Sequence, residues 1–365
     1  MRVLFYLGDK QWTGSSRAAL MAARGLVARG HQVTLACCGD SRLGRDATAA
    51  EIETIEISTA TTTFGGAFDL RKVLAQRFIE VAIVASDRDQ LLVASAMRFA
   101  ERGAVLRRVP SFEALEMQRV GRLSLKLASS GIIVTTDRER KSLEQPGWTI
   151  PATVAPLGVD VATYDGIEPV NRTVLTAPQH SILIGCSYDP SGRYRLGSVF
   201  RTLALLAPRH VNIHVFVFGP GSNDDELRMH ASALGVSPVV TFLGEREDER
   251  ELMRAAHAGW IVSGSDTSAF ACLDFMALRI PVIAERSPIT QHYVAHGITG
   301  LLLSPGDASF TASTIASFLT GDEKRIAMGN AGRTRVQRDF PEAAMIDGFE
   351  QAVNAAGDRT KWATT

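Results

Sequence analysis

Two aspartates, Asp266 and Asp274, stand eight residues apart in the segment 266–307, across an expected junction between a loop and a helix. Ionised carboxylates are charged acceptors of hydrogen bonds. The helix expected to open near Phe270, after Ser268 and Ala269, would present free N–H groups, and such a helix start is a natural seat for a diphosphate. Two plainer roles stay open: an aspartate near a helix N-terminus, and a solvated carboxylate on a helix surface.

A second group of candidate residues is cationic. Arg193 and Arg195 flank Tyr194 in the run 185–197, which begins with Gly185 in an apolar strand-like stretch. Guanidinium groups at such a place can neutralise the charge of a leaving group. The alternative is that both are solvated loop residues, since arginine is common on protein surfaces.

Polar residues also follow two expected strands of the first half. Gly14 and Ser15 stand at the start of an expected helix, where they would contact a ligand or simply cap the helix. Trp12, a large aromatic residue in a short polar loop, is a candidate for stacking on a ligand. Asp87 and Asp89 come after a later strand, and we expect them to line a ligand cleft rather than to hold a metal ion.

The sequence predicts no metal site. His292 and His296 have the i,i+4 spacing of two ligands on a helix, but no clear third ligand accompanies them. We therefore expect surface histidines. The four cysteines, Cys37, Cys38, Cys186 and Cys272, show no CxxC or zinc-like spacing and are expected to be reduced packing residues of a cytoplasmic protein.

Short β-branched runs alternate with helical stretches along the chain, a pattern typical of parallel sheets with helices on both faces. One series of strands is expected at 3–7, 32–37, 53–57, 81–85, 104–108 and 131–134, and another at 181–186, 213–218, 239–242, 259–262, 281–284 and 300–303. Helices are expected at 16–29, 90–101, 113–127, 137–144 and 341–356. Four prolines and two glycines interrupt residues 149–179, where we expect a hinge.

Composition sets the broad class. The chain has 365 residues, 45% of them hydrophobic and 21% charged, which is too long for one simple core and favours two domains. A formal net charge of zero argues against a protein that binds duplex nucleic acid. The apolar run at the N-terminus is about five residues long, too short for a signal peptide, and no stretch approaches the roughly 18 apolar residues of a membrane span.

A resemblance to a known family adds to these patterns. The run from Asp266 to Asp307 resembles, without a gap, the nucleotide-sugar-binding segment of retaining GT-B glycosyltransferases, family 4, also described as glycosyl transferases group 1. In that family the paired acidic residues are usually Glu-x7-Glu. Residues 155–160, Ala-Pro-Leu-Gly-Val-Asp, resemble the Pro-x-Gly-Val-Asp run that leads into the family's interdomain linker.

The resemblance implies an α/β protein of the GT-B fold, with two Rossmann-like, doubly wound domains facing across a cleft. We expect an N-terminal acceptor-binding domain at 1–163, a linker at 164–179 and a C-terminal nucleotide-sugar-binding domain at 180–340. A last helix at 341–357 would cross back to the N-terminal domain.

The resemblance also implies roles for the candidate residues. Asp266 would face the hydroxyl groups of the transferred sugar, and Asp274 those of the ribose. The implied catalytic residues are Asp266, Asp274, Arg193 and Arg195. The implied donor-binding residues are Gly14, Ser15, Gly185, Ser268, Ala269, Phe270 and Asp274, and the implied acceptor-binding residues are Trp12, Asp87 and Asp89.

Several positions depart from the family pattern. The Glu-Gly-Phe-Gly run is replaced by Asp266-Thr267-Ser268-Ala269, whose side chains narrow the approach to backbone amides. Pro288 and Ile289 replace a Gly-Gly pair, and His292 takes the place of a Glu. Cys186 stands at the usual Arg position, and the run after the fifth strand, 106–111, lacks the histidine found in many relatives.

The expected function is retaining, metal-independent and cofactor-independent transfer of a sugar from a UDP- or GDP-sugar to a glycan, a lipid-linked acceptor or a small molecule. The alternatives are a catalytically impaired scaffold or binding protein of the same fold, and a nucleotide-sugar epimerase. The expected helix at 113–127 lies in a stretch with a local excess of basic residues and suits peripheral contact with the inner face of a membrane.

Overall fold

The structure, a computed structural model, describes residues 1–57, 64–109, 125–126, 128–144, 147–206, 212–262, 265–304 and 306–362. The chain forms two compact units, Met1–Leu157 with Glu342–Thr365, and Gly158–Pro341. Each unit is a parallel sheet with helices on its faces, so the predicted α/β, doubly wound class is confirmed. Most of the helix expected at 113–127 lies outside the described residues.

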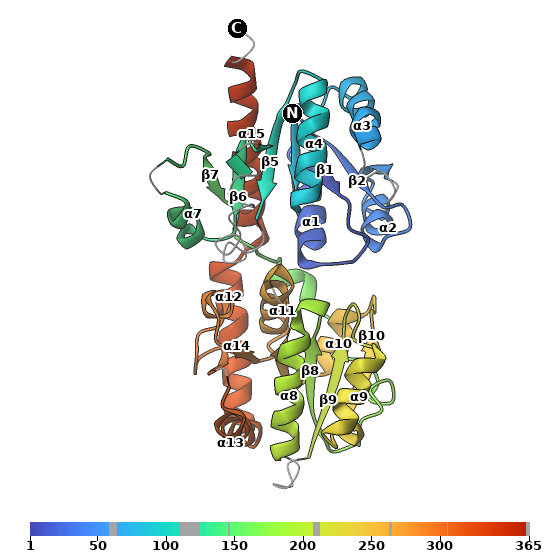
Figure 1. Cartoon of the computed structure of the whole chain (residues 1–365). Helices are drawn as coiled ribbons and strands as arrows, with labels where there is room; N and C mark the ends of the chain where they lie inside the picture. The colour runs from blue at the N-terminus through green and yellow to red at the C-terminus, as the bar shows by residue number, and fades with distance from the viewer. Residues whose placement is uncertain are drawn as a thin grey trace. The chain divides into compact units, whose positions relative to one another are not determined.

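The first unit contains a seven-stranded parallel sheet in the order β3-β2-β1-β4-β5-β6-β7 (Figure 1). The predicted strands are mostly buried in it, apart from the edge strand at 53–56, which is largely exposed. Its strands are β1 (Arg2–Leu7), β2 (Gln32–Cys37), β3 (Glu53–Glu56), β4 (Val81–Val84), β5 (Ala104–Arg108), β6 (Gly131–Val134) and β7 (Ala152–Val154).

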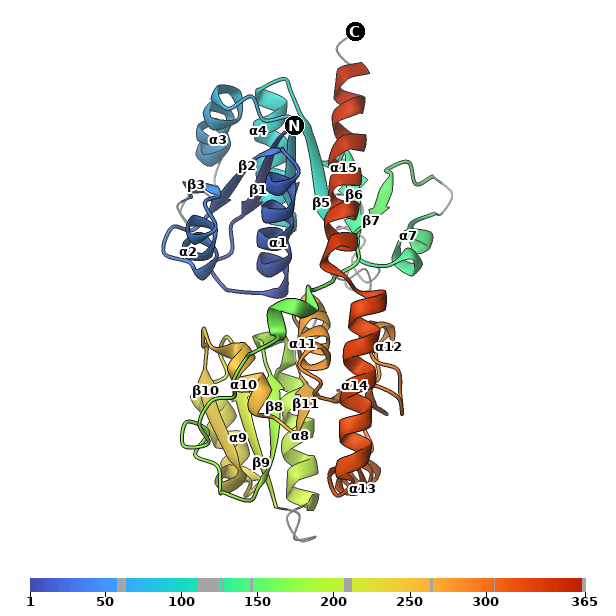
Figure 2. The ribbon, with the colours of Figure 1, turned by 180° about the vertical axis from the view of Figure 1, so that it is seen from behind.

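Helices cover both faces of this sheet. They are α1 (Gly14–Ala28), α2 (Arg42–Ala49), α3 (Phe64–Gln76), α4 (Asp87–Phe99), α7 (Asp137–Leu143) and α15 (Glu342–Trp362). α15 packs against α1, β5, β6 and β7, whereas α3 and α4 pack together and bury residues such as Leu74 and Val93 against the other face (Figures 1 and 2). α1 ends before Gly30, whose φ of +85° suits the glycine that commonly ends a helix.

The second unit contains a six-stranded parallel sheet in the order β10-β9-β8-β11-β12-β13. Its strands are β8 (Ile182–Ser187), β9 (Ile213–Phe218), β10 (Val240–Gly244), β11 (Ala258–Ile261), β12 (Val282–Glu285) and β13 (Gly300–Leu303). All six lie within two residues of the expected positions, because each is a short buried apolar run.

α8 (Arg193–Leu206), α9 (Asp225–Ala233) and α13 (Ala308–Leu319) lie on one face of the second sheet (Figure 1). α10 (Glu249–Ala255), α11 (Ser265–Ala277), α12 (Pro288–Tyr293) and α14 (Asp322–Asp339) belong to the other face (Figure 2). The short helices are η1 (Val161–Tyr164), η2 (Pro190–Gly192) and η4 (Ser237–Val239).

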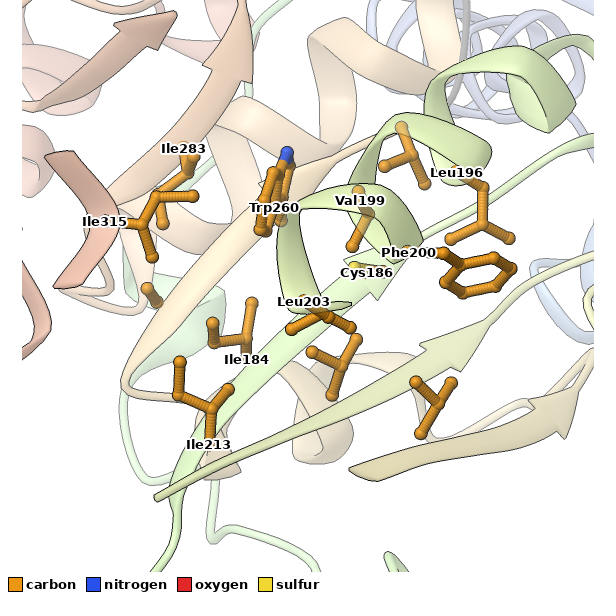
Figure 3. Packing of buried hydrophobic residues seen from close by; sticks show 14 of the residues in the cluster. Ile184, Cys186, Leu196, Val199, Phe200, Leu203, Ile213, Trp260, Ile283 and Ile315 are labelled. Atoms are coloured by element: carbon orange, nitrogen blue, oxygen red, sulfur yellow. The ribbon is translucent and has the colours of Figure 1, made fainter. Parts of the chain in front are cut away.

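A cluster of buried apolar side chains lies on the α8 face of the second sheet. Leu196, Val199, Phe200 and Leu203 of α8 pack on side chains of the sheet, and Trp260 lies beside them (Figure 3). On the α11 face, the ring of Phe275 lies over two strand glycines: a Cβ atom at Gly259 would come within 2.3 Å of the ring, and one at Gly185 within 3.3 Å. The two glycines therefore make room for Phe275.

Three helices begin earlier than the sequence predicted, and one of them, α1, starts at Gly14 instead of residue 16. α4 starts at Asp87 instead of residue 90, because Ser86 caps it by accepting a hydrogen bond from Asp89 N at 3.0 Å. α11 starts at Ser265 rather than near Phe270, so the interpretation of Asp266 as a loop residue is wrong. An acidic residue in the first turn is favourable to the helix dipole, which accounts for the longer helix. β7, α2 and α3 were not expected.

Candidate functional site

Each sheet has one place where the connections leave neighbouring strands in opposite directions. In the second sheet β8 continues to β9 on one side and β11 to β12 on the other, and in the first sheet β1 and β4 are related in the same way. Ligands of open parallel sheets bind outside the carboxyl ends of the strands at such switch points. The candidate residues of both units follow these strands.

Asp266 lies in the first turn of α11, directly after the carboxyl end of β11, and is 3% exposed. In a helix that starts at residue 265, the N–H groups of the first turn lack an acceptor within the helix and can bind an anion. Ala269 and Phe270 lie beyond that turn and are both 2% exposed. Both residues therefore follow the first-turn amides, and Ser268, which precedes them, is also buried.

Asp274 lies eight residues further along the same helix. This separation corresponds to roughly 12 Å along the axis and to directions about 80° apart, so the two carboxylates cannot bind the same group. Asp274 Oδ1 accepts a hydrogen bond from the Tyr164 hydroxyl at 2.5 Å, and both residues are 3% exposed. This contact joins η1 to α11.

The two candidate arginines have different surroundings. Arg193, the first residue of α8, pairs with Asp224 at 2.8 Å and with Glu226, on the side of the unit where α9 begins. Arg195 Nε lies 3.4 Å from Oε2 of Glu285, the last residue of β12. Arg195 and Glu285 line a cavity of about 220 Å³, and Trp260 and Ile261 of β11 also line it. Arg195 is thus the arginine brought to the carboxyl ends of the central strands.

Gly185 and Cys186 are interior residues of β8. Gly185 pairs with Gly259 of β11 and lies under Phe275. Cys186 is fully buried in the core on the α8 face, and burial raises the pKa of its thiol. Its neutral side chain packs where relatives usually place a cation.

In the first unit, Asp89 links the segments that follow β1 and β4, the two strands of the switch point. Its carboxylate accepts a hydrogen bond from the backbone N–H of Gly8, which follows β1, at 3.1 Å. Asp89 itself belongs to the first turn of α4, which follows β4, and burial raises the pKa of its carboxyl group. A Cβ atom at Gly8 would lie 2.6 Å from Asp89 Oδ1, so glycine permits this close approach.

Asp87 pairs with an arginine that sequence reasoning did not select. Arg107 of β5 lies 3.2 Å from Asp87 Oδ1, and its side chain is only 7% exposed. Its Nε and Nη1 have no hydrogen-bond partner, and burial lowers the pKa of its guanidinium to about 10. Asp87 is 45% exposed, so the pair extends from the buried sheet to the surface of the carboxyl edge.

Gly14 and Ser15 occupy the first turn of α1, after the N-cap Thr13, whose hydroxyl accepts from Ser16 N at 3.3 Å. Trp12 is half-buried, and the guanidinium of Arg42 lies 4.5 Å from the centre of its ring. Trp12 and Thr13 lie in the loop after β1, at the same edge of the sheet as the start of α4. The aromatic face is therefore already occupied on one side by a cation.

Both histidines lie at the surface, as predicted, and each also has a contact within the protein. His296 Nδ1 accepts a hydrogen bond from Leu302 N at 3.0 Å, and His292 packs edge-on against Tyr293 with ring centres 4.9 Å apart. Across the described ranges, no three His, Cys, Asp or Glu side chains are grouped closely enough to hold a metal ion. None of the described helices is long and apolar enough to cross a bilayer.

A larger hollow of about 1020 Å³ lies in the first unit, at the opposite end of the sheet. It is lined by the segment before β4, the start of β5 and the C-terminal half of α4, including Phe78, Glu80, Ser95 and Gly103. It is therefore at the amino edge and is separate from the candidate residues.

Three residues complete the candidate sites beyond those selected from the sequence: Tyr164, Glu285 and Arg107. Each is distant in sequence from its partner, by 110 residues for Tyr164 and Asp274. A charged Arg107-Arg108 pair at the end of an apolar strand was the one visible signal, because buried arginines are rare unless paired.

One family of known proteins matches most of the second unit in sequence. The sequence profile described as "Glycosyl transferases group 1" matches residues 193–335, a range that contains Arg193, Arg195, Asp266 and Asp274. The lipopolysaccharide core biosynthesis glycosyltransferase LpsE of Rhizobium meliloti (strain 1021) is 24% identical over 263 residues, which cover 70% of this chain and 74% of the relative. The D-inositol 3-phosphate glycosyltransferase of Corynebacterium efficiens is 34% identical over 185 residues, 47% of this chain and 43% of the relative. The chain thus spans less than half the length of that second relative.

The fold is shared with solved structures over nearly the whole chain. The crystal structure of Anabaena Alr3699/HepE in complex with UDP and glucose superimposes with a TM-score of 0.79 at 16% identity, covering 97% of this chain and all of that chain. An identity this low speaks for the fold alone. Residues 193–335 thus resemble the group 1 glycosyl transferases, and the chain has the GT-B fold.

Proposed function

We propose that the protein is a retaining glycosyltransferase that moves a sugar from a nucleotide diphosphate sugar, UDP- or GDP-linked, to an acceptor bound by the first unit. The donor would bind to the second unit at the carboxyl ends of β8 and β11. Asp266 and Asp274 would bind its hydroxyl groups, and Arg195 and the first turn of α11 would bind its phosphates.

One observation carries the proposal. Asp266 is a buried carboxylate in the first turn of a 13-residue helix, at the switch point of the sheet and within the segment matched by the family profile. An anion bound by the N–H groups of that turn would have a charged hydrogen-bond acceptor for sugar hydroxyls directly beside it.

The spacing of the two aspartates suits an extended donor. Because Asp266 and Asp274 are roughly 12 Å apart along α11, one can bind the sugar and the other the ribose, with a diphosphate between them. Bond cleavage leaves negative charge on the nucleotide diphosphate. Arg195 lies 3.4 Å from Glu285, at the carboxyl end of β12, and would neutralise part of that charge.

We propose that the acceptor is a glycan, a lipid-linked saccharide or a small polyol, held at the carboxyl edge of the first sheet by Trp12, Asp87 and Asp89. The mixture of an aromatic face, carboxylates and the buried Arg107 supports a polyhydroxylated acceptor, because it offers apolar contact, acceptors and donors together. All four cysteines are buried free thiols, which supports a reducing, cytoplasmic location.

Calorimetry tests the donor site. The protein is titrated with UDP, GDP and ADP, and then with UDP-glucose and GDP-mannose. We expect the nucleotide with one of the three bases to bind with a Kd of micromolar order. Asp266→Ala should weaken that binding or abolish sugar transfer from the corresponding sugar nucleotide. If none of these nucleotides binds, the proposed function is wrong.

A second candidate is a protein that binds the nucleotide without transferring a sugar. Two observations favour it: Cys186 leaves the usual arginine position neutral, and Arg193 is engaged by Asp224 and Glu226. Release of free nucleotide from the bound sugar nucleotide, followed with and without added acceptors, separates the two. A binding protein would release none under any condition.

A further inference from the structure

The hydrogen bond between Tyr164 and Asp274 joins two well-buried side chains in the proposed donor-binding unit. The Tyr164 hydroxyl donates to Asp274 Oδ1 at 2.5 Å, and each residue is 3% exposed. Asp274 is one methylene shorter than the glutamate usual in the family, so its carboxylate reaches less far from α11. A phenol that reaches it from another segment fixes the direction in which the carboxylate points.

Tyr164 is itself held from several sides. It ends η1, whose N-cap Asp160 accepts a hydrogen bond from Ala162 N at 3.0 Å. The guanidinium of Arg250 lies over its ring, 4.4 Å from the centre. The next residue, Asp165, is held by Arg333 at 2.7 Å.

Arg333 connects this segment to the same helix that carries Asp274. Its Nη1 donates to the carbonyl oxygen of Ala277, the last residue of α11, at 2.8 Å. η1 and the second half of α11 are therefore fastened at two points, through Tyr164 and through Arg333. The phenol hydroxyl has little freedom to leave the carboxylate.

We infer that Tyr164 is a positioning residue for the donor: its hydroxyl orients the Asp274 carboxylate towards the vicinal hydroxyl groups of the donor ribose. The inference rests on the proposed function. A carboxylate has about four acceptor positions on its two oxygens, so it can accept hydrogen bonds from the phenol and from a ribose hydroxyl at the same time. Fixing its rotamer in advance avoids the loss of side-chain entropy on binding.

The competing explanation is that the bond only fastens η1 to α11 and has no part in recognition. The two explanations differ in what the ribose hydroxyls contribute. A purely structural bond would change the binding of a ribonucleotide and of its deoxy analogue equally, whereas a positioning bond would change only the ribonucleotide.

The experiment compares Tyr164→Phe with the wild type in calorimetric titrations of the nucleotide diphosphate that the wild type binds and of its 2′-deoxy form. Phenylalanine keeps the ring under Arg250 and removes only the hydroxyl. We expect the wild type to prefer the ribonucleotide by about tenfold and Tyr164→Phe to lose most of that preference, by weakening ribonucleotide binding alone. Tyr6→Phe, at a buried tyrosine of the first unit, is the matched control and should leave both affinities unchanged.

Asp274→Asn provides a second measurement. It should also remove the ribose preference, and adding Tyr164→Phe to it should produce no further change. Equal weakening of both nucleotides by Tyr164→Phe, or an unchanged ribose preference, would overturn the inference while leaving the proposed function intact. If the wild type binds no nucleotide, the proposed function fails first and the inference falls with it.

Discussion

Asp266 and Asp274 share one helix but have different environments. Asp266 lies in the first turn of α11, and Asp274 lies two turns later, hydrogen-bonded to Tyr164. The family resemblance assigns them to different parts of the donor. The proposed function keeps that division, with Asp266 nearer to the reacting end of the donor.

Replacing Asp266 by asparagine keeps the size of the side chain and removes its charge. We expect kcat/KM for sugar transfer to fall roughly 100-fold, because a charge-assisted hydrogen bond formed in the transition state is lost. Steady-state kinetics with the preferred sugar nucleotide measure the effect. Asp225→Asn, at an exposed aspartate of α9, is the control, and equal kinetics of the two variants would refute the role of Asp266.

Packing around Phe275 leads to a prediction about stability. A methyl group at Gly259 would come within 2.3 Å of the ring, whereas one at Gly185 would approach it only to 3.3 Å and Phe216 to 2.9 Å. We expect Gly259→Ala to lower the free energy of unfolding by about 1–3 kcal/mol, as overpacking does, and Gly185→Ala to lower it less. Chemical denaturation measures both, and the reverse order would contradict this account of the core.

At the scale of elements, α15 is held against the rest of the first unit by ion pairs as well as by packing. Arg29, at the end of α1, pairs with Glu350 at 2.6 Å and with Asp347, and His31 lies 3.2 Å from Glu350. Beneath them, Phe349 and Val353 of α15 are fully buried. The ionic contacts therefore border an apolar interface.

These contacts predict a dependence on pH. The hydrogen bonds from His31 and Arg29 lower the pKa of Glu350 below its usual 4.5. The folded chain thus holds this proton less tightly than the unfolded chain, so the stabilisation is present above about pH 4.5 and is lost as the pH falls through the lowered pKa. It should amount to no more than about 1 kcal/mol, because the side chain is reached by solvent.

Glu350→Gln should therefore lower the melting temperature at pH 7 and have little effect near pH 3. Thermal unfolding followed by circular dichroism across this range measures the difference. Glu323→Gln, at an exposed glutamate of α14, is the control. A constant difference between Glu350→Gln and the wild type at every pH would contradict the ionic explanation.

The elements that the sequence predicted well are buried apolar runs. β13 falls at its expected position because Thr299 and Ser304 flank its apolar run, and β5 begins as expected after Gly103. α2 was missed because its sequence, Arg-Leu-Gly-Arg-Asp-Ala-Thr-Ala, is short and polar and its capping by Ser41 depends on the fold. β7 was missed because it has three half-buried residues at a sheet edge.

The candidate sites divide in the same way. Spacing and resemblance selected Asp266, Asp274 and Arg195, because these residues are close in sequence to a recognisable strand-to-helix junction. Tyr164 could not be found from the sequence, since its partner is 110 residues away. The contrast between Arg193 and Arg195 also depends on tertiary contacts, because it follows from which carboxylates the fold brings to each arginine.

At the scale of the whole molecule, the proposed function predicts transfer without a metal ion, because Arg195 and the N-terminal turn of α11 would supply the positive charge that stabilises the leaving group. We expect transfer activity to be unchanged by an excess of EDTA and not to be stimulated by Mg²⁺ or Mn²⁺. A loss of activity that Mn²⁺ restores would contradict this charge assignment, while nucleotide binding in the presence of EDTA shows whether the donor site itself persists.

The first unit is built from two separate stretches, because its last helix, α15, follows the second unit in the sequence. During synthesis, the groove that receives Phe349 and Val353 stays uncovered until about 180 further residues have been translated, which takes about 10–40 s at roughly 5–20 residues per second. The nascent first unit therefore exposes an apolar surface for that time, and it is during translation that the chain is most open to aggregation and to binding by chaperones.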